Sequence, residues 1–550
     1  MPASVTWLYK PMFPFVEKMR KETTMANSMA KLFFLLVTVF TSIFPAATST
    51  SAGFEQGFLQ CFQAILGNNT TSEVTFSKSS SSYEPLLNSS IRNARFLSSS
   101  VPKPNVIVTP QSLFHIQVAL LCSKKNNLEV RVRSGGHDYE GLSYVSHVPF
   151  LIIDLVNLRS IEINMDEESA WVQSGATVGE LYYAIAQKSK VHGFPAGSCS
   201  TMGVGGHFSG GGFGTIFRKY GLASDNVIDA QIIDVNGKIL NRTLMGEDLF
   251  WAIRGGGGSS FGVITAWKIK LVHVPSIVTV FDVSRSLDQG ATDLFHKWQT
   301  VAPKLPAELF LHNVVGVSNS ASQGGKTVVV YFTGLYLGTA ENLLPLMQNN
   351  FSELGLQHNN FSQMTWIQSV LHFAGYSIDE SLEVLLRRNQ TSSSFKAKSD
   401  YVKEPIPLVG LEGLWNMLLS ENSPLLIFTP YGGKMSEISE SETPFPHRKG
   451  NLYGIQYSVN LVSNEEAPKH LDWMRRLYEY MTPYVSKLPR QSYLNYRDLD
   501  LGVNQGKLNY ENAKSWGLKY FKNNFEKLTQ VKARVDPGNF FRDEQSIPPL

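Results

Sequence analysis

The 550-residue sequence predicts an α+β fold with two domains. Between residues 102 and 275, short β-branched strands alternate with helices and run into glycine-rich loops. Beyond Pro275, helical stretches separate longer strands, a pattern that is typical of an antiparallel sheet covered by helices. The chain is long enough for two or three hydrophobic cores. Its 43% apolar and 17% charged residues exclude a disordered or collagen-like protein.

The first domain is expected to span residues 53–275, with its core in residues 102–275. A helix over residues 54–66 comes first, and a serine-rich surface loop at residues 77–82 follows it. β-branched runs and the alternation of apolar and polar residues indicate the strands. We expect strands at residues 106–109, 128–133, 150–155, 170–174, 227–235 and 262–272, with helices at 110–124 and 175–188.

The second domain is expected over residues 276–509. Its strands are predicted at residues 278–283, 327–332 and 454–462, and its helices at 289–301, 339–354 and 465–481. In the last of these strands, Gln456 lies on a polar face, opposite the apolar face of Ile455 and Tyr457. Residues 510–550 contain a further helix and are expected to return to the first domain.

Residues 1–52 have the layout of a leader with a secretory signal. A short apolar run follows Lys31 and is shorter than the ~20 residues that a membrane span needs, although a single anchor helix is the alternative. Met25 and Met29 allow an internal start. The leader holds five basic and two acidic residues, which accounts for the whole net charge of +3. No basic stripe is present elsewhere, so we expect neither nucleic acid nor stable membrane association.

Export through the secretory pathway predicts a glycoprotein in the apoplast, the vacuole or a compartment derived from the endoplasmic reticulum. The acceptor pattern Asn-x-Ser/Thr is short and arises by chance, but several copies behind a signal fit a secreted protein. It occurs at Asn68, Asn69, Asn88, Asn241, Asn350, Asn360 and Asn389.

The chain has only three cysteines, Cys61, Cys122 and Cys199. These are too few for a zinc ribbon or a disulfide-dense scaffold, and no metal site is expected. In an oxidising compartment two of them can pair, and we favour Cys61 with Cys122. Closing a loop of that length stabilises the fold by about 4 kcal/mol in the chain-entropy model. Cys199 is then left over.

Three glycine-rich loops stand out, at residues 133–141, 193–214 and 254–262. Glycine lets backbone N–H groups approach a phosphate closely, so three such loops suit a long anionic ligand such as a dinucleotide. The alternative is that they are only turns. Phe208 and Ser260 stand where the Rossmann pattern needs its third glycine, and no lysine follows the glycines as a P-loop requires.

His137 lies in the first of these loops and Cys199 in the second. Considered separately, each residue has a simpler structural interpretation: His137 as a histidine in a turn, and Cys199 as a small buried apolar residue. Together, a nucleophilic imidazole and a leftover thiol in glycine-lined loops indicate covalent attachment of a cofactor.

At these residues the chain resembles the berberine bridge enzyme-like family of plant flavoproteins. The resemblance covers residues 53–550, and its motifs lie at residues 133–141, around Cys199, and at 246–258, 493–500 and 545–550. It implies a two-part FAD-binding domain of the vanillyl-alcohol-oxidase (PCMH) type, a substrate domain, and a disulfide between Cys61 and Cys122. It also implies FAD bonded to both His137 and Cys199. The FAD-binding residues would be Arg133, Ser134, Gly135, Gly136, His137, Cys199, Gly203, Gly205, Gly206, His207 and Gly210.

The family resemblance also implies hydride transfer to flavin N5, with a base that takes a proton from the substrate. The matching residues are Tyr496, Gln456 and Tyr493. A tyrosine base needs a pKa below its usual value of about 10, which a nearby cation or hydrogen bond can supply. If the segment is extended, the two tyrosines point to opposite faces, and we favour Tyr496 as the base. The alternative is a core aromatic residue.

At three positions this chain differs from some members of the family that it resembles. Phe213 stands where some carry a second active-site tyrosine, and Gly454 stands where some carry a lysine. Met202 stands at the position that gates oxygen in relatives, where it is usually a valine or leucine. We expect Met202 to slow reoxidation by O2 and to favour another electron acceptor.

The function that follows is an exported, monomeric FAD-dependent oxidoreductase of specialised metabolism. Its substrate would be a small molecule such as an alkaloid, a phenolic compound or a prenylated phenol, and ring closure can accompany the oxidation. Three alternative functions stay open. They are a cyclase of the Diels–Alderase kind without net redox, a carbohydrate oxidase, and a binding protein without flavin.

Overall fold

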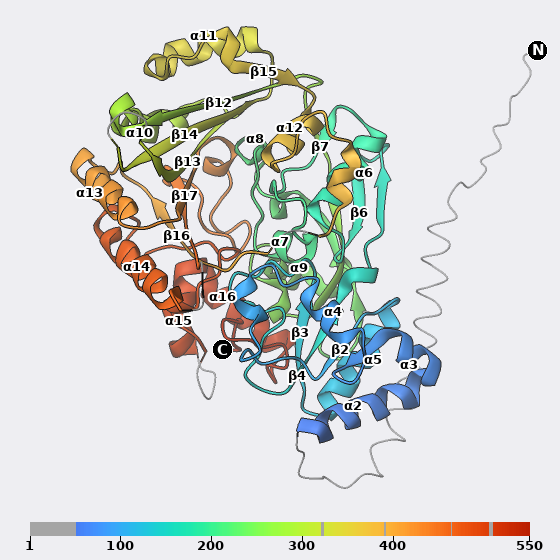
Figure 1. The fold of residues 1–550 in the computed structure, drawn as a ribbon. Coiled ribbons are helices and arrows are strands. Elements are labelled where there is room, and N and C mark those ends of the chain that lie inside the picture. Colours follow the sequence, from blue (N-terminus) through green and yellow to red (C-terminus); the bar gives the residue numbers. More distant parts are fainter. Residues whose placement is uncertain (1–50, 321–323, 390–391, 462, 464, 505–509) are drawn as a thin grey trace, which may run out of the picture. The chain divides into compact units, whose positions relative to one another are not determined.

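The computed structural model describes residues 51–320, 324–389, 392–461, 463, 465–504 and 510–550 (Figure 1). The chain divides into two units, residues 1–53 and 54–550, and the fold below is that of the second. The predicted secretory signal lies outside the described residues. Within them, no helix is both long and apolar enough to cross a membrane.

The first sheet has four strands, and its centre is buried on both faces. Its order is β1 (Thr75–Ser77), β2 (Val106–Val108), β4 (Phe150–Asp154) and β3 (Glu129–Arg133). The last three strands are parallel, and every residue of β4 is buried, as continuous β-branched and apolar runs predict. Cys61 on α2 (Ser51–Leu66) is bonded to Cys122 on α5 (Leu113–Lys125), with 5.7 Å between their Cα atoms. The predicted disulfide is confirmed.

The second sheet is antiparallel and has five strands. Its order is β5 (Ile161–Asn164), β6 (Ser169–Gln173), β10 (Val263–Lys270), β8 (Val227–Ile233) and β9 (Ile239–Leu240). The helices α6 (Val178–Lys188), α7 (Val204–Ser209) and α9 (Arg242–Ile253) pack on it or beside it (Figure 1). A separate two-stranded ribbon pairs β7 (His192–Gly193) with β11 (Val272–His273).

The third sheet has seven antiparallel strands, which confirms the predicted architecture of the second half. Its order is β15 (Phe361–Met364), β12 (Val278–Ser286), β14 (Lys326–Tyr336), β13 (Leu309–Asn319), β17 (Pro424–Pro430), β18 (Tyr453–Asn460) and β16 (Phe395–Val402). Helices pack against its outer face, namely α10 (Ala291–Val301), α11 (Ala340–Phe351), α13 (Leu408–Leu419) and α14 (Ala467–Tyr480) (Figure 1). Ile455 and Tyr457 of β18 are buried, whereas Gln456 is half-buried on the opposite face.

The C-terminal helices are α15 (Tyr510–Phe521) and α16 (Asn524–Val535). α16 packs on α9, and Lys532 Nζ donates a 2.6 Å hydrogen bond to the Ser260 carbonyl. These contacts agree with a return of the tail to the first half of the chain. The predicted domain boundaries near residues 275 and 510 stay predictions.

The glycosylation acceptors lie at the surface, with one exception. Asn360 is half-buried and its side-chain oxygen accepts a hydrogen bond from Gln357 N. The other six asparagines are exposed, namely Asn68, Asn69, Asn88, Asn241, Asn350 and Asn389. Their modification stays a prediction.

Candidate active site

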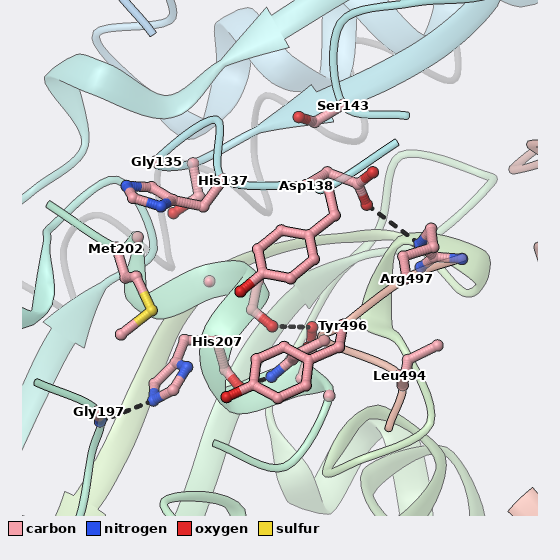
Figure 2. Close-up of a pocket in the computed structure, with 18 of the residues that line it drawn as sticks. Gly135, His137, Asp138, Ser143, Gly197, Met202, His207, Leu494, Tyr496 and Arg497 are labelled. Atoms are coloured by element: carbon pink, nitrogen blue, oxygen red, sulfur yellow. Dashed lines mark hydrogen bonds and ion pairs between the residues drawn. The ribbon is translucent and has the colours of Figure 1, made fainter. Parts of the chain in front are cut away.

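Residues of all three glycine-rich loops line one cavity of about 560 Å³. This volume lies in the range of cofactor and ligand pockets. Figure 2 labels residues of the first two loops and of the segment around Tyr496 that line it. The lining includes most of the residues that the sequence predicts for FAD and catalysis, from both halves of the chain. They are Ser134, Gly135, Gly136, His137, Cys199, Met202, Gly203, Gly205, Gly206, His207, Gly210, Gln456, Tyr493 and Tyr496.

The first two loops are in direct backbone contact, and only glycine fits there. A Cβ atom on Gly135 would lie 2.2 Å from Gly203 N, and one on Gly203 would lie 2.2 Å from Gly135 N. The third loop is fixed on α7, because the Ser209 carbonyl accepts hydrogen bonds from Gly255 N and Gly257 N at 2.8 and 2.9 Å. The loops therefore form one continuous backbone wall that leaves room for a ligand.

His137 and Cys199 lie on the same side of this cavity. His137 Nε2 is 2.9 Å from the Thr201 hydroxyl, and Cys199 Sγ is 3.6 Å from the same oxygen. Burial, together with the charge of Arg92 and then His207, lowers the pKa of His137 to about 3. The imidazole is therefore neutral at physiological pH and keeps a nucleophilic ring nitrogen.

Met202 extends between His137 and His207 (Figure 2). Its methyl group packs so close to Gly197 that a Cβ atom there would lie 2.5 Å from Met202 Cε. Gly197 N donates a 2.9 Å hydrogen bond to His207 Nε2, and burial lowers the pKa of His207 to about 4. The contact with a fixed backbone holds the Met202 side chain in place on the cavity wall.

The residues around the cavity fit a flavin dinucleotide. Arg92, Arg131 and Arg542 line it, and guanidinium groups suit a diphosphate. Arg131 is paired with Glu544 and Arg542 with Glu129, at 3.0 and 2.8 Å. Four buried polar atoms on lining residues have no hydrogen-bond partner within the described chain, as expected where a ligand supplies acceptors. These atoms are Arg92 Nε, Arg131 Nε, Ser143 Oγ and Arg497 Nη1.

Arg133 is the one predicted FAD contact that does not line the cavity. Its side chain is fully buried and bonds Asp154 Oδ2 at 2.6 Å and the carbonyls of Leu86 and Leu87. The guanidinium at the end of β3 thus points into the protein, where it holds the α4 segment (Tyr83–Asn88) against the first sheet. The side chain therefore makes no contact with the cavity, and a role of Arg133 in FAD binding stays a prediction.

Tyr493 and Tyr496 both line the cavity, contrary to the expectation that they point to opposite faces. The chain turns here instead of being extended, because Tyr496 N donates a 2.9 Å hydrogen bond to the Tyr493 carbonyl. The two rings are 5.0 Å apart at 78°. The Tyr493 hydroxyl accepts hydrogen bonds from Gly212 N and Asn495 Nδ2, whereas no described residue hydrogen-bonds the Tyr496 hydroxyl.

Tyr139 is a site residue that sequence reasoning missed, although it belongs to the first glycine loop. Its ring stacks on Tyr496 at 5.5 Å and 6°. Its hydroxyl accepts a 2.8 Å hydrogen bond from Gln456 Nε2. Gln456 thus both lines the cavity and contacts Tyr139. Next to it, Asp138 and Arg497 form an ion pair at 3.0 Å (Figure 2).

The pKa of Tyr496 is not lowered, as a tyrosine base would need. Burial, and then the nearby Tyr139, Tyr493 and Tyr431, raise the pKa of this hydroxyl well above its usual range. Phe213 lies edge-on to Tyr496 at 6.0 Å, and Gly454 supplies no charge. In the protein alone, Tyr496 is thus a hydrogen-bond donor.

The seven-stranded sheet contributes a wall that the sequence did not reveal. Its lining residues are Phe310, His312, Ile427, Thr429 and Gln456, to which Phe395 adds a ring from β16. Phe373, at the end of α12 (Trp366–Phe373), completes it. Burial lowers the pKa of His312 to about 4, so this imidazole is neutral. Among these described residues none is acidic.

Comparison with known proteins identifies the family of this chain. A family model described as FAD binding domain matches residues 104–243, and one described as berberine and berberine like matches residues 492–548. A tetrahydroberberine oxidase of Berberis wilsoniae is 50% identical over 530 residues, which cover 95% of this chain and 99% of that protein. The chain belongs to the berberine bridge enzyme-like family.

Other similar proteins are named for different activities. Monolignol oxidoreductase AtBBE-like 13 of Arabidopsis thaliana is 50% identical over 535 residues, covering 95% of this chain and 98% of that protein. The crystal structure of Phl p 4, a grass pollen allergen with glucose dehydrogenase activity, matches with a TM-score of 0.85 and 45% identity, covering 90% of this chain and 99% of that chain. This berberine bridge enzyme-like protein is an FAD-linked oxidoreductase with the predicted α+β fold.

Proposed function

We propose that the protein oxidises a neutral aromatic alcohol or phenol of plant specialised metabolism, with FAD bonded to both His137 and Cys199. The observation that carries the substrate class is the second-half cavity wall, which is aromatic and has no acidic side chain among its described residues. Two carboxylates line the cavity outside this wall: Asp138 is paired with Arg497, and Asp543 acts electrostatically on the same arginine. A cationic amine packed against the wall itself would therefore lack a carboxylate partner there, whereas a planar neutral ring gains contact with aromatic rings. A relative named as a monolignol oxidoreductase supports this choice.

Bound FAD supplies a hydride acceptor at N5. The chain supplies positioning and proton transfer. The Tyr496 hydroxyl, which no described residue bonds, is available to the hydroxyl of a substrate. Gln456 holds Tyr139 by its amide, and Tyr139 in turn stacks on Tyr496 and fixes its ring. When Tyr496 is ionised, its oxygen accepts the proton that the substrate hydroxyl releases.

A substrate panel tests the proposed function. It contains hydroxycinnamyl alcohols, a benzylisoquinoline amine and gluco-oligosaccharides, and each reaction is followed by bleaching of the flavin and by product mass. We expect bleaching and loss of two hydrogens with the neutral aromatic alcohols. Bleaching by the amine alone would contradict the substrate class, and product formation without bleaching would contradict the redox function.

Two alternatives also have observations in their favour. Tyr496 is protonated in the protein alone, which suits a cycloaddition that needs no base. The polar side chains of His312, Thr429 and Gln456 suit a sugar, and the similar structure of Phl p 4 is named as a glucose dehydrogenase. The same panel separates these alternatives from the proposal.

The location that we infer is the secretory pathway, with an extracellular or vacuolar destination. The disulfide between Cys61 and Cys122 supports it, because such bonds persist in oxidising compartments and are rare in the cytosol. Retention of a fluorescent fusion in the cytosol would contradict this inference.

The double attachment of FAD predicts that the flavin stays with the unfolded protein. After denaturation in acid, we expect yellow colour in the pellet for the wild type and for either single variant, His137→Ala or Cys199→Ala. The double variant should release all flavin, because both nucleophiles on that side of the cavity are gone. Release from either single variant would show that only one covalent bond exists.

Met202 predicts slow reoxidation by oxygen. Its side chain lies on the cavity wall between His137 and His207, and a shorter valine would open that space. We expect Met202→Val to speed stopped-flow reoxidation by O2 about tenfold, which corresponds to about 1.4 kcal/mol of barrier. Reduction of the flavin by substrate is the control and should be unchanged. A wild-type oxygen rate that is fast and the same in Met202→Val would contradict the gating role.

A further inference from the structure

Three side chains with metal-binding atoms converge beside the β7–β11 ribbon, and none of them lines the cavity. Glu168 Oε1 lies 3.2 Å from His192 Nε2 and 2.7 Å from His273 Nε2. The ligand atoms of all three residues lie within 4.8 Å of one another. They come from three separate segments of the chain, and no short motif joins them.

The fold holds this cluster in place through its backbone. His192 and His273 are directly opposite each other in the antiparallel ribbon, so their side chains leave on the same side. Their ring centres are 4.5 Å apart. Leu271 N donates a 2.7 Å hydrogen bond to the Glu168 carbonyl, which ties the turn before β6 to the strand that carries His273.

Ser189 orients the inner imidazole. Its hydroxyl is 2.7 Å from His192 Nδ1, on the ring edge away from Glu168. When the hydroxyl accepts a proton from Nδ1, the lone pair of the ring is on Nε2 and faces the cluster. This is the arrangement in which histidine ligates a metal, with its other nitrogen bonded to a neighbouring acceptor.

We propose that Glu168, His192 and His273 bind one zinc ion. Two imidazoles and a carboxylate suit zinc and disfavour calcium or magnesium, which prefer oxygen ligands. Ligands of a tetrahedral zinc ion are about 3.3 Å apart. Glu168 Oε1 lies 3.2 and 2.7 Å from the two imidazole nitrogens, and all three ligand atoms lie within 4.8 Å, so small side-chain shifts bring them to that spacing. The His273 side chain is 68% exposed and that of Glu168 is 38% exposed, so water has access to the remaining coordination position.

The ion would link three elements near the active site without touching it. β7 leads directly into the loop that carries Cys199, and β11 leads to β12 and the seven-stranded sheet. Because zinc would bind the folded chain and not the unfolded chain, it would raise the midpoint temperature of thermal unfolding. This inference does not depend on the proposed function, because it concerns neither FAD nor substrate.

The test uses the full-length holoprotein without a histidine tag. Zinc affinity is measured at pH 7.5 by competition with a chromophoric chelator, and the bound metal is counted by mass spectrometry. We expect one zinc per chain in the wild type. His273→Ala and Glu168→Gln should each weaken binding by at least about 100-fold, and Ser189→Ala by about tenfold. His358→Ala, at an exposed histidine on another element, is the control and should bind as the wild type does.

A second measurement keeps the test independent of how the variants fold. Copper(II) replaces zinc in the wild type, and its electron paramagnetic resonance spectrum reports coupling to nitrogen ligands. Oxidised flavin is not paramagnetic and contributes no signal to this spectrum. Coupling to two nitrogens supports the site. Coupling to fewer nitrogens, no stoichiometric zinc in the wild type, or equal affinity in His273→Ala would overturn it.

Discussion

Tyr496→Phe is expected to lower the rate of flavin reduction by substrate about 10²- to 10⁴-fold, the range for loss of a general acid–base group. The substitution removes only the hydroxyl, which makes no hydrogen bond to any described residue. The phenylalanine ring keeps the stack on Tyr139 and the edge contact with Phe213. Stability and flavin content should therefore stay unchanged, and the loss should lie in the chemical step.

Single-turnover stopped-flow measurement of flavin bleaching checks this result. Tyr493→Phe is the matched control, since the Tyr493 oxygen already accepts bonds from Gly212 N and Asn495 Nδ2 and is occupied as an acceptor. Its loss leaves a buried N–H without a partner, so we expect a stability cost of about 1–3 kcal/mol and a smaller effect on rate. Equal rates in Tyr496→Phe and the wild type would exclude Tyr496 as the proton acceptor.

The regular strands of the fold could be predicted because their periodicity is clean, and the missed strands show where that signal fails. β18 alternates between buried and half-buried residues and was predicted. Its neighbour β16 was missed, because Lys396 and Lys398 look like surface residues. Both lysines are buried and bond Asp498, each at 2.7 Å. A charged strand becomes buried only when its partner arrives from a distant segment, and the local pattern does not contain that partner.

The same limit applies to the site. The glycine loops could be recognised because glycine is needed where the backbone approaches a ligand closely, and this need is visible in the local sequence. The structure brings the loops to one cavity. The wall formed by residues such as Phe310 and His312 could not be recognised, since aromatic residues in a sheet look like core. Whether Tyr493 and Tyr496 share a face depended on one turn, which a single backbone hydrogen bond decides. Side-chain roles thus depended on long-range geometry more than on residue type.

Gly454→Lys is expected to shift the pH profile of flavin reduction to lower pH. A Cβ atom at Gly454 would lie 3.4 Å from Tyr401 Cε1 and 3.7 Å from Tyr431 Cε2, which are ordinary contacts, so a side chain can begin there without a clash. Tyr431 is one of the groups that act electrostatically on Tyr496. An ammonium group at this position stabilises the Tyr496 phenolate, and a nearby opposite charge lowers a pKa by about 1–3 units.

The sign follows from which form of Tyr496 reacts. Because the phenolate accepts the proton and the pKa of Tyr496 is raised, the wild-type rate should increase about tenfold per pH unit through the neutral range. Lowering that pKa moves the rise toward acid, so the rate at pH 7 should increase about ten- to thousandfold in Gly454→Lys. Gly454→Met fills similar space without charge and is the control. A shift of the same size in Gly454→Met would assign the effect to packing, and a profile that is flat in the wild type would mean that Tyr496 does not act as the base.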